Sequence, residues 1–324
     1  MNYRSIKTLN QDIIDWIPRL PREIDLIVGV PRSGLLAANL LSLHVNLPLA
    51  DLDGFLNSRI IGSGKRHNIA KSEDFLQKRR KVLVIDDSLF TGHQMNQVKE
   101  VIHNANLQHE IYYAAVYVAP DNQKILDFYY EFLPMPRVFE WNFMHHADMQ
   151  KWCVDIDGVL CRDPTEKEND DGQKYIHFLK TVQPLIIPSN PVGWLVTCRL
   201  EKYREITNEW LERHGIKFKN LIMMDFPDKE SRVSAGSHST FKANIYKDVG
   251  AALFIESSLN QAREIAQLSR RDVLCIETRE MINPSFIQRN IHKQHLFFRL
   301  LLTDPKGAFK EGYRFMRKIY GKIC

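Results

Sequence analysis

The 324-residue chain is short of cysteine and has no long apolar stretch. Its five cysteines are odd in number and lack the paired spacing of metal ligands, which argues against a disulfide framework or a zinc site. No segment approaches the roughly 18 uncharged apolar residues that span a bilayer. The polar start MNYRSIKTLNQD also lacks the apolar stretch of a signal peptide. We therefore expect reduced thiols and a cytoplasmic location.

Net charge is low over most of the chain and is concentrated near its end. Residues 281–324 hold nine lysines and arginines against two acids, a net of +7, whereas the whole chain carries +5. Aromatic and aliphatic residues alternate with these bases, which is typical of a basic amphipathic helical tail. Such a tail either contacts an anionic membrane surface, at the inner face of the cell membrane, or packs on the preceding domain. Nucleic-acid binding is a weaker reading, because no recognised motif accompanies the charge.

Short β-branched apolar runs alternate with helix-length periodic segments along the first 280 residues. This alternation predicts an α/β protein with two doubly wound parallel-sheet domains, since each strand pair needs a helical crossover. The predicted domains are residues 1–148 and 149–280, followed by the tail, 281–324. The best linker lies between Pro134 and Lys151, where periodicity is lost. The expected strands are 25–30, 81–86, 111–119, 152–157, 193–197, 221–225 and 252–256, and the expected helices are 35–44, 93–105, 201–214 and 259–269.

The strongest motif of the first half is VLVIDDSLFTGHQM, residues 82–95, in which an apolar strand leads to Asp86, Asp87 and a Thr-Gly loop. Carboxyl ends of parallel strands bind ligands in α/β folds, and a loop that enters a helix offers backbone N–H groups to phosphate. The motif resembles the phosphoribosyl pyrophosphate (PRPP) motif of type I phosphoribosyltransferases. The resemblance implies that the acidic pair is catalytic and holds the ribose hydroxyls. It assigns the 5-phosphate to the loop residues Ser88, Leu89, Phe90, Thr91, Gly92 and His93.

Two positions depart from that family pattern. Phe90 and Gln94 stand where the family usually has small hydroxyl residues, so we expect the grip on the phosphate to differ in detail. The alternative reading of the acidic pair is a solvated strand end.

A second element supports the first. In IVGVPRSGLLAA, residues 27–38, a strand is followed by Arg32, Ser33 and Gly34 and then by a helix, which resembles the pyrophosphate loop of the same family. A tight turn supplies N–H groups there, and Arg32 supplies charge-assisted hydrogen bonds to the leaving pyrophosphate.

The stretch SRIIGSGKRHN between the two motifs contains Arg59, Lys65, Arg66 and His67. It resembles the mobile loop that closes over the reaction in this family, and Lys65 and Arg66 are then substrate-binding residues. A solvated basic loop is the alternative.

The second half begins with CVDIDGVLC, residues 153–161, in which an apolar strand ends in Asp155 and Asp157. Two carboxylates one residue apart can divide nucleophilic and acid/base work around one phosphorus. This resembles the first motif of the haloacid-dehalogenase-like (HAD) phosphatases, which implies that Asp155 attacks phosphorus and that Asp157 moves the proton.

The later motifs of that family follow in order. LVTCR places Thr197 and Arg199 as phosphate-binding residues after the next strand, and KANIYKDVGAALFIESS offers Lys242 as the phosphate-neutralising lysine, with Lys247 as runner-up. The resemblance makes Asp155, Asp157 and Glu256 ligands of Mg²⁺, which favours oxygen ligands. Ser257 stands where many relatives have a second acid. An inactive HAD-like fold is the alternative, and the nearby cysteines are read as strand-packing side chains.

Neither interval between these motifs has room for a large cap domain, so we predict an open, capless phosphatase site. Transfer from PRPP leaves a 5-phosphate on the new ribosyl group, which a fused phosphatase removes. The two resemblances together predict a bifunctional enzyme that adds ribofuranose to an acceptor, a lipid-linked bacterial glycan hydroxyl. One alternative is a nucleobase phosphoribosyltransferase with a nucleotide phosphatase, in salvage or degradation. The other is a non-enzymatic PRPP-sensing regulator.

Overall fold

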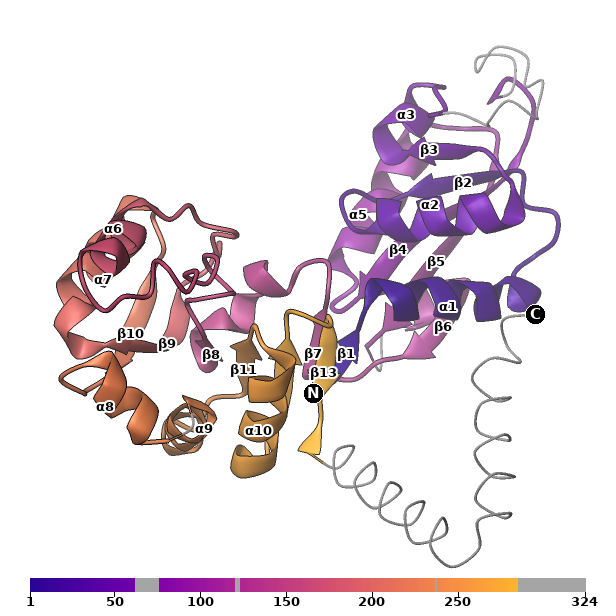
Figure 1. The fold of residues 1–324 in the computed structure, drawn as a ribbon. Coiled ribbons are helices and arrows are strands. Elements are labelled where there is room, and N and C mark those ends of the chain that lie inside the picture. The colour runs from indigo at the N-terminus through magenta and orange to yellow at the C-terminus, as the bar shows by residue number, and fades with distance from the viewer. Residues whose placement is uncertain (62–75, 120–122, 237, 285–324) are drawn as a thin grey trace, which may run out of the picture. The chain divides into compact units, whose positions relative to one another are not determined.

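The computed structural model describes residues 1–61, 76–119, 123–236 and 238–284 of the chain (Figure 1). The chain divides into two compact units, Met1–Phe143 and Met144–Cys324. No helix within the described ranges is long and apolar enough to cross a membrane. The predicted lid residues Lys65, Arg66 and His67 lie outside the described residues, as does the predicted tail from residue 285 onward.

The first unit is built on a five-stranded sheet with strand order β3-β2-β4-β5-β6, and all neighbouring strands are parallel. Two neighbouring parallel strands cannot be joined by a short turn, and this is why helices separate the strands along the chain. Its strands are β1 (Asn2–Arg4), β2 (Leu26–Gly29), β3 (Leu49–Asp51), β4 (Lys81–Leu89), β5 (Glu110–Val118), β6 (Phe128–Phe132) and β7 (Arg137–Phe139). Its helices are α1 (Ile6–Trp16), η1 (Ile17–Arg19), α2 (Gly34–Val45), α3 (Leu52–Leu56), α5 (His93–Asn104) and η2 (Gln123–Ile125).

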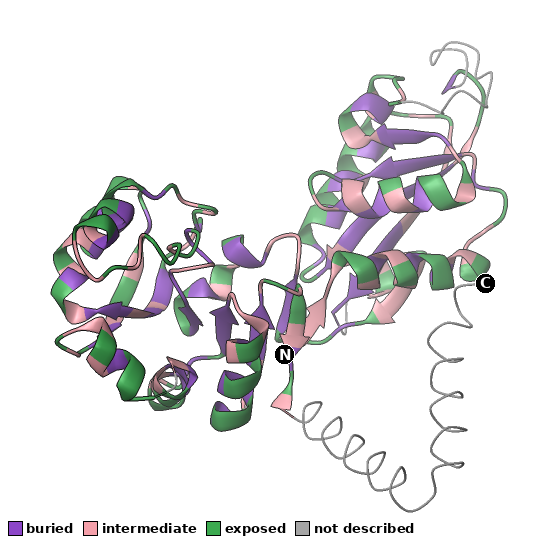
Figure 2. Cartoon of the chain, viewed as in Figure 1, coloured by how far each residue is buried: buried purple, intermediate pink, exposed green. Residues whose placement is uncertain are grey.

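Both faces of this sheet are buried, which Figure 2 shows as purple strands between helices. Leu83 and Ile85 of β4 pack in one core cluster with apolar residues of α1 and α2. Val82 and Val84, which alternate with them, pack in a second cluster with α3 and α5. Alternate side chains of a strand point to opposite faces, so a strand covered on both sides needs an unbroken apolar run. This is why the sequence of β4 predicted a buried parallel strand.

A separate two-stranded parallel sheet joins the start of the chain to residues expected to form the linker. Arg4 of β1 lies in register with Phe139 of β7, and Asn2 lies in register with Arg137. The boundary between the two units, at Phe143 and Met144, falls within the linker predicted between Pro134 and Lys151, but the strand β7 inside that range was not foreseen. Three residues are too few to show a periodic pattern, and they form a strand only because β1 supplies the partner. The same segment also holds the short 3₁₀ helices η3 (Phe143–His145) and η4 (Ala147–Lys151).

The second unit contains a six-stranded sheet with order β10-β9-β8-β11-β12-β13. Its strands are β8 (Trp152–Val154), β9 (Val192–Leu200), β10 (Phe218–Met224), β11 (Leu253–Glu256), β12 (Val273–Cys275) and β13 (Glu280–Ile282). Its helices are α6 (Gln173–Thr181), η5 (Glu201–Tyr203), α7 (Arg204–Arg213), α8 (Lys229–Ser234), α9 (His238–Asp248) and α10 (Leu259–Ser269).

One strand of this sheet departs from the predicted all-parallel arrangement. β13 pairs with β12 in the antiparallel direction, and the few residues between the two strands are too short for a crossover helix. Arg279, in this turn, has a positive φ of 56°. The mixed α/β class with parallel sheets is confirmed, with an antiparallel edge strand added. β13 also reaches into residues that we expected to belong to the tail.

Helices α9 and α10 bury one face of the second sheet through a cluster that includes Tyr246, Phe254 and Ile265. Figure 1 places α6 and α7 on the other side of the strands. Trp210 of α7 is fully buried there, and its indole N–H donates to the Val182 carbonyl at 2.7 Å. The interval between β8 and β9, which is described throughout, contains α6 as its one α-helix.

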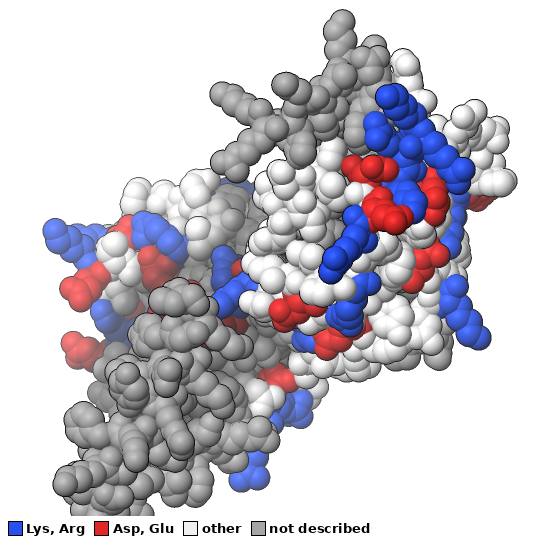
Figure 3. All heavy atoms as spheres, turned by 90° about the vertical axis from the view of Figure 1, so that its right-hand side faces the viewer, with Lys and Arg blue, Asp and Glu red and all other residues white. Residues whose placement is uncertain are grey.

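Opposite charges are interspersed on the face drawn in Figure 3. Surface ion pairs of the first unit include Arg80 with Asp25 and Arg79 with Glu110, each at 3.8 Å. The bases that give the chain its positive net charge belong to residues 289–322, outside the described ranges.

We expect Trp210→Ala to lower the free energy of unfolding by about 3–5 kcal/mol, because it opens a cavity in a closed core and leaves a buried carbonyl without its donor. The measurement is urea unfolding followed by circular dichroism. Leu185→Ala is the control: Leu185 is 62% exposed, so its truncation should change stability by less than about 0.5 kcal/mol. Equal effects of the two substitutions would contradict the described packing.

Candidate active sites

Asp86 and Asp87 lie in the central strand of the first unit and are almost fully buried, with 5% and 3% of their surface exposed. β4 continues to Leu89, so the pair is part of the paired strand rather than of the loop after it. Asp86 lies in register with Ala115 of β5. The reading of the pair as a solvated strand end is therefore wrong, because both carboxylates are held inside the fold.

The two predicted motifs of this unit meet at Asp86. Gly34 is the first residue of α2, and a β-carbon added to it would come within 2.8 Å of an Asp86 carboxylate oxygen and 3.0 Å of the Asp86 α-carbon. Only glycine allows the helix start to approach the strand this closely. The Gln94 side-chain amide also donates to the Pro31 carbonyl at 3.0 Å, which ties the start of α5 to the loop before α2. The peptide bond between Pro31 and Arg32 is cis.

Burial raises the pKa of Asp86 to about 8, and the adjacent Asp87 charge adds to this effect. One Asp86 oxygen accepts a hydrogen bond from the Asp87 backbone N–H at 2.9 Å. Asp87 accepts from the Trp141 indole N–H at 2.8 Å, and Trp141 in turn stacks on Phe139 with ring centroids 4.8 Å apart. Nothing in the sequence pattern pointed to Trp141, because only the fold brings it to the acidic pair.

The remaining predicted residues of this site lie around the same sheet edge. Arg32, Phe90, Thr91 and His93 are exposed, Ser33 and Ser88 are half-buried, and Leu89 and Gly92 are buried. Gly92 is the residue before the first turn of α5. Arg59, proposed for the lid, is exposed and forms an ion pair with Asp53 at 3.4 Å.

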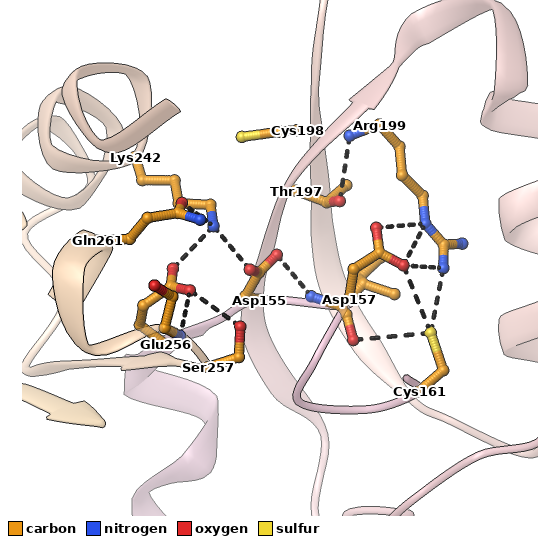
Figure 4. Close-up of polar contacts among 12 residues, drawn as sticks. Asp155, Asp157, Cys161, Thr197, Cys198, Arg199, Lys242, Glu256, Ser257 and Gln261 are labelled. Carbon is orange, nitrogen blue, oxygen red and sulfur yellow. Dashed lines mark hydrogen bonds and ion pairs between the residues drawn. The ribbon is translucent and has the colours of Figure 1, made fainter. Parts of the chain in front are cut away.

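In the second unit, Lys242 of α9 joins two of the predicted acids (Figure 4). Its ammonium group donates to Asp155 at 2.6 Å, to Glu256 at 2.7 Å and to the Gln261 side chain at 3.0 Å. All three charged residues are buried, and Asp155 and Glu256 follow or end the adjacent strands β8 and β11. Lys247 is exposed in the last turn of α9, so Lys242 is the lysine that reaches this site. Gln261 was not predicted.

Asp157 is held apart from that cluster by Arg199. The guanidinium donates to one Asp157 oxygen at 2.7 Å through Nη2 and to the other at 3.0 Å through Nε. The Arg199 side chain is fully buried, and its Nη2 also lies 3.2 Å from the Cys161 sulfur. Thr197 is fully buried and accepts from the Arg199 backbone N–H at 3.2 Å. The structure thus brings all predicted residues of the second site together, in two ion-paired groups.

Burial and ion pairing oppose each other at these groups. Burial raises the pKa of Asp155, while the Lys242 charge acts to lower it. Burial acts to lower the pKa of Lys242, but Asp155 and Glu256 raise it above its ordinary value. The same competition raises the pKa of Arg199, because Asp157 outweighs the loss of water. Lys242 and Arg199 therefore stay charged beside the buried acids, whereas burial outweighs the Lys242 charge at Asp155 and raises its pKa.

A further acid lies beside this site that the sequence did not indicate. Gly158 has a φ of +77°, and a β-carbon added to it would overlap the Ser257 side chain and lie 3.0 Å from an Asp163 oxygen. Burial raises the pKa of Asp163, and the charges of Asp157 and Glu256 add to the effect. Asp163 therefore lies close to Ser257, although it comes from a different loop.

The carboxylates of this site have the oxygen chemistry that Mg²⁺ favours, but their side chains do not converge on one point. Asp155 and Glu256 share Lys242, whereas both oxygens of Asp157 face Arg199. Within the part of the chain that the structure describes, no group of three or more His, Cys, Asp or Glu side chains is placed to hold a metal ion. The side chains as arranged do not fit a three-carboxylate magnesium site.

Comparison with known proteins bears on the first unit. Residues 2–147 match the family model described as the phosphoribosyl transferase domain. No curated protein matches the chain. Among solved structures, a xanthine-guanine-hypoxanthine phosphoribosyltransferase from Helicobacter pylori is 17% identical, with 43% of this chain and 90% of that chain covered and a TM-score of 0.31. A purine phosphoribosyltransferase from Pyrococcus horikoshii is 23% identical, with 43% and 92% covered and a TM-score of 0.31.

These structural similarities are too low to add to the family match, which stands on its own. The N-terminal part of the chain, residues 2–147, is a phosphoribosyltransferase domain of the type I class. Its presence supports a transferase that uses PRPP.

We expect Asp86→Asn to remove a pH-dependent loss of stability. A carboxyl whose pKa is raised on folding keeps its proton in the folded state after the unfolded state has lost it. The wild-type protein should therefore lose stability relative to the variant as pH rises from about 5 to 8, with a slope approaching about 1.4 kcal/mol per pH unit. Urea unfolding across this pH range, without ligand, measures the difference. Asp53→Asn, at a side chain that is 78% exposed, should run parallel to wild type; a parallel Asp86→Asn curve would show that the buried pair does not titrate in this range.

Proposed function

We propose that the chain transfers the 5-phosphoribosyl group of PRPP to a hydroxyl of an acceptor, a lipid-linked glycan, and then removes the 5-phosphate to leave a ribofuranosyl group. The observation that carries this proposal is the presence, on one chain, of a phosphoribosyltransferase domain and of a second buried site built on Asp155, Lys242 and Glu256. An enzyme that makes nucleotides needs the 5-phosphate, whereas an enzyme that attaches ribofuranose has to remove it.

In the transfer step, the acceptor hydroxyl oxygen forms a bond to the anomeric carbon while the bond from that carbon to pyrophosphate breaks, and the hydroxyl proton passes to the leaving pyrophosphate. Asp86 and Asp87 hold the ribose hydroxyls, and the Trp141 hydrogen bond fixes the orientation of Asp87. Arg32 and the backbone at the start of α2 take up the negative charge of the leaving pyrophosphate. Ser88 to His93 bind the 5-phosphate at the start of α5. Gly34 and Gln94 keep the two loops in contact.

In the hydrolytic step, an Asp155 oxygen attacks the 5-phosphate, and the bond from phosphorus to the ribose oxygen breaks. Lys242 holds Asp155 in place and offsets the charge that gathers on the phosphoryl group, with Thr197 as the proposed hydroxyl donor. Asp157 gives a proton to the leaving ribose oxygen. It later takes a proton from a water whose oxygen bonds to phosphorus, while the bond from phosphorus to Asp155 breaks and inorganic phosphate leaves. Both oxygens of Asp157 accept from Arg199, so this proton transfer requires Arg199 to release it or to turn to the phosphate.

Mg²⁺ remains part of this proposal as the ion that accompanies PRPP. The steps above rest on the protein's own side chains. An open second site, with one helix between β8 and β9, suits a phosphate carried on a bulky acceptor. Contact of the residues beyond 284 with a membrane surface also belongs to the proposal.

We expect Asp155→Asn to stop the sequence after transfer. Purified protein is incubated with PRPP, Mg²⁺ and panels of glycan acceptors and free bases, and pyrophosphate release and product masses are measured. Wild type should yield a ribosylated acceptor, whereas Asp155→Asn should release pyrophosphate and accumulate a product heavier by one phosphate. Asp248→Asn, an exposed carboxylate at the end of α9, is the matched control and should behave as wild type.

Other outcomes separate the alternatives. A product formed only with free bases would identify a nucleobase phosphoribosyltransferase. Binding of PRPP without release of pyrophosphate in any mixture would favour a PRPP-sensing regulator. If Asp155→Asn gave the same products as wild type, the sequential scheme would be abandoned.

A further inference from the structure

Arg137 is a buried arginine beside the acidic pair of the first unit, and the transfer scheme above gives it no role. It is the first residue of β7, and 6% of its surface is exposed. Its guanidinium carbon lies 5.6 Å from the centre of the Phe90 ring and 5.4 Å from the centre of the Phe139 ring. The side chain is therefore packed between β7 and the loop proposed to hold the 5-phosphate.

The positive charge of Arg137 lacks an ion-pair partner among the described residues. Its Nη1 atom is buried and has no hydrogen-bond partner there. Burial lowers the pKa of Arg137, and the charge that opposes this effect belongs to Asp87. No described carboxylate lies within ion-pair distance of the guanidinium.

Arg4, in the neighbouring strand of the same small sheet, is an arginine that has acidic partners within the fold. Its Nη2 atom donates to both oxygens of Glu131 at 2.7 Å, and its Nε atom lies 3.7 Å from Asp12. The first unit therefore provides acidic partners for the half-buried Arg4, whereas no described carboxylate lies within ion-pair distance of the buried Arg137.

An unpaired buried charge is costly, because it has lost water without gaining a partner. Because no described carboxylate lies within ion-pair distance of Arg137, its buried charge is suited to an anion from outside the chain. An arginine binds anionic oxygen groups, and phosphate above all, through parallel hydrogen bonds. The position of Arg137 then decides which anion it receives.

The topology separates Arg137 from the pyrophosphate loop. β2, which leads to Arg32, lies on one side of β4, and β5 lies on the other. Arg137 comes from the β5 side, because Phe139 of the same strand stacks on Tyr117 of β5 with centroids 5.6 Å apart. The strand that leads to Arg32 and the strand that Arg137 packs toward therefore lie on opposite sides of β4.

Two positions of the loop motif next to Arg137, Phe90 and Gln94, offer no hydroxyl donor to the 5-phosphate. Phe90 occupies a position where a hydroxyl is expected, and its ring lies against the guanidinium. The Gln94 amide is turned to the Pro31 carbonyl. We propose that Arg137 binds the 5-phosphate of PRPP, supplying a charged donor beside this loop. This inference rests on the proposed transfer function and assigns a further specificity-determining residue to its site.

The test measures the affinity of the full chain for ribose 5-phosphate, pyrophosphate and PRPP by isothermal titration calorimetry. Arg137→Met should weaken binding of ribose 5-phosphate and of PRPP about 10- to 100-fold, the usual effect of losing a charge-assisted hydrogen bond. Binding of pyrophosphate should stay unchanged. Arg19→Met is the control, because Arg19 also lies over an aromatic ring, that of Tyr130 at 4.6 Å, but is exposed at η1; this variant should bind all three probes as wild type does.

Thermal unfolding without ligand separates binding from structural support. If Arg137 serves a ligand, Arg137→Met should melt at or above the temperature of wild type, since the substitution removes an unpaired buried charge. If Arg137 only supports the fold, the variant should melt lower while its folded fraction binds ribose 5-phosphate as wild type does, and the proposal would be wrong. Arg137→Lys keeps the charge but not the paired donors, so it should bind ribose 5-phosphate with intermediate affinity. This variant replaces Arg137→Met in the affinity measurements if the methionine variant does not fold.

Four further results would overturn the inference. Unchanged affinity of both Arg137 variants for ribose 5-phosphate would exclude the contact, and an equal loss of pyrophosphate affinity would place the arginine elsewhere. A change confined to the acceptor's KM would assign Arg137 to an anionic acceptor instead. Failure of the wild-type chain to bind PRPP or ribose 5-phosphate would contradict the proposed transfer function as well as the role of Arg137. The other results concern Arg137 alone.

Discussion

In both units, carboxylates are buried at the carboxyl ends of the central strands, and neighbouring elements supply the groups that pair with them. A parallel sheet covered by helices on both faces keeps water away from its strands, so a carboxylate placed there needs a donor or a cation from the fold. In the second unit Lys242 serves Asp155 and Glu256, and Arg199 serves Asp157. In the first unit Asp86 and Asp87 receive only neutral donors in the described contacts, a backbone N–H and the Trp141 indole.

This difference gives the two sites different electrostatic characters. The second site has its negative charge balanced by buried bases, so a phosphate that enters it competes with Asp155 and Asp157 for Lys242 and Arg199. The first site keeps a surplus of negative charge on one side and an unpaired arginine, Arg137, on the other. A ligand with both hydroxyl groups and a phosphate, as in a phosphorylated ribose, matches that combination.

Much of the fold follows from the sequence because buried parallel strands need unbroken apolar runs. The strands β2, β4, β5, β9 and β11 and the helices α2, α5, α7 and α10 fall within a few residues of their predicted bounds. The prediction failed where an element is too short to show a period. β7 is a strand because β1 pairs with it, and β13 is a strand because it extends the sheet edge beside β12. No local pattern contains those partners.

The sequence by itself determined the two acidic motifs, the small residues around them and their order along the chain, because each motif is a local strand-loop-helix pattern. The family match confirms the phosphoribosyltransferase reading of the first pattern, and the phosphatase reading of the second stays a prediction. Only the tertiary structure decided which long-range partners reach the acids: Trp141 at Asp87, Arg137 beside Phe90, Lys242 between Asp155 and Glu256, and Asp163 next to Ser257. These contacts join residues from separate elements, and the packing of helices and strands, not the local sequence, sets the distance between them.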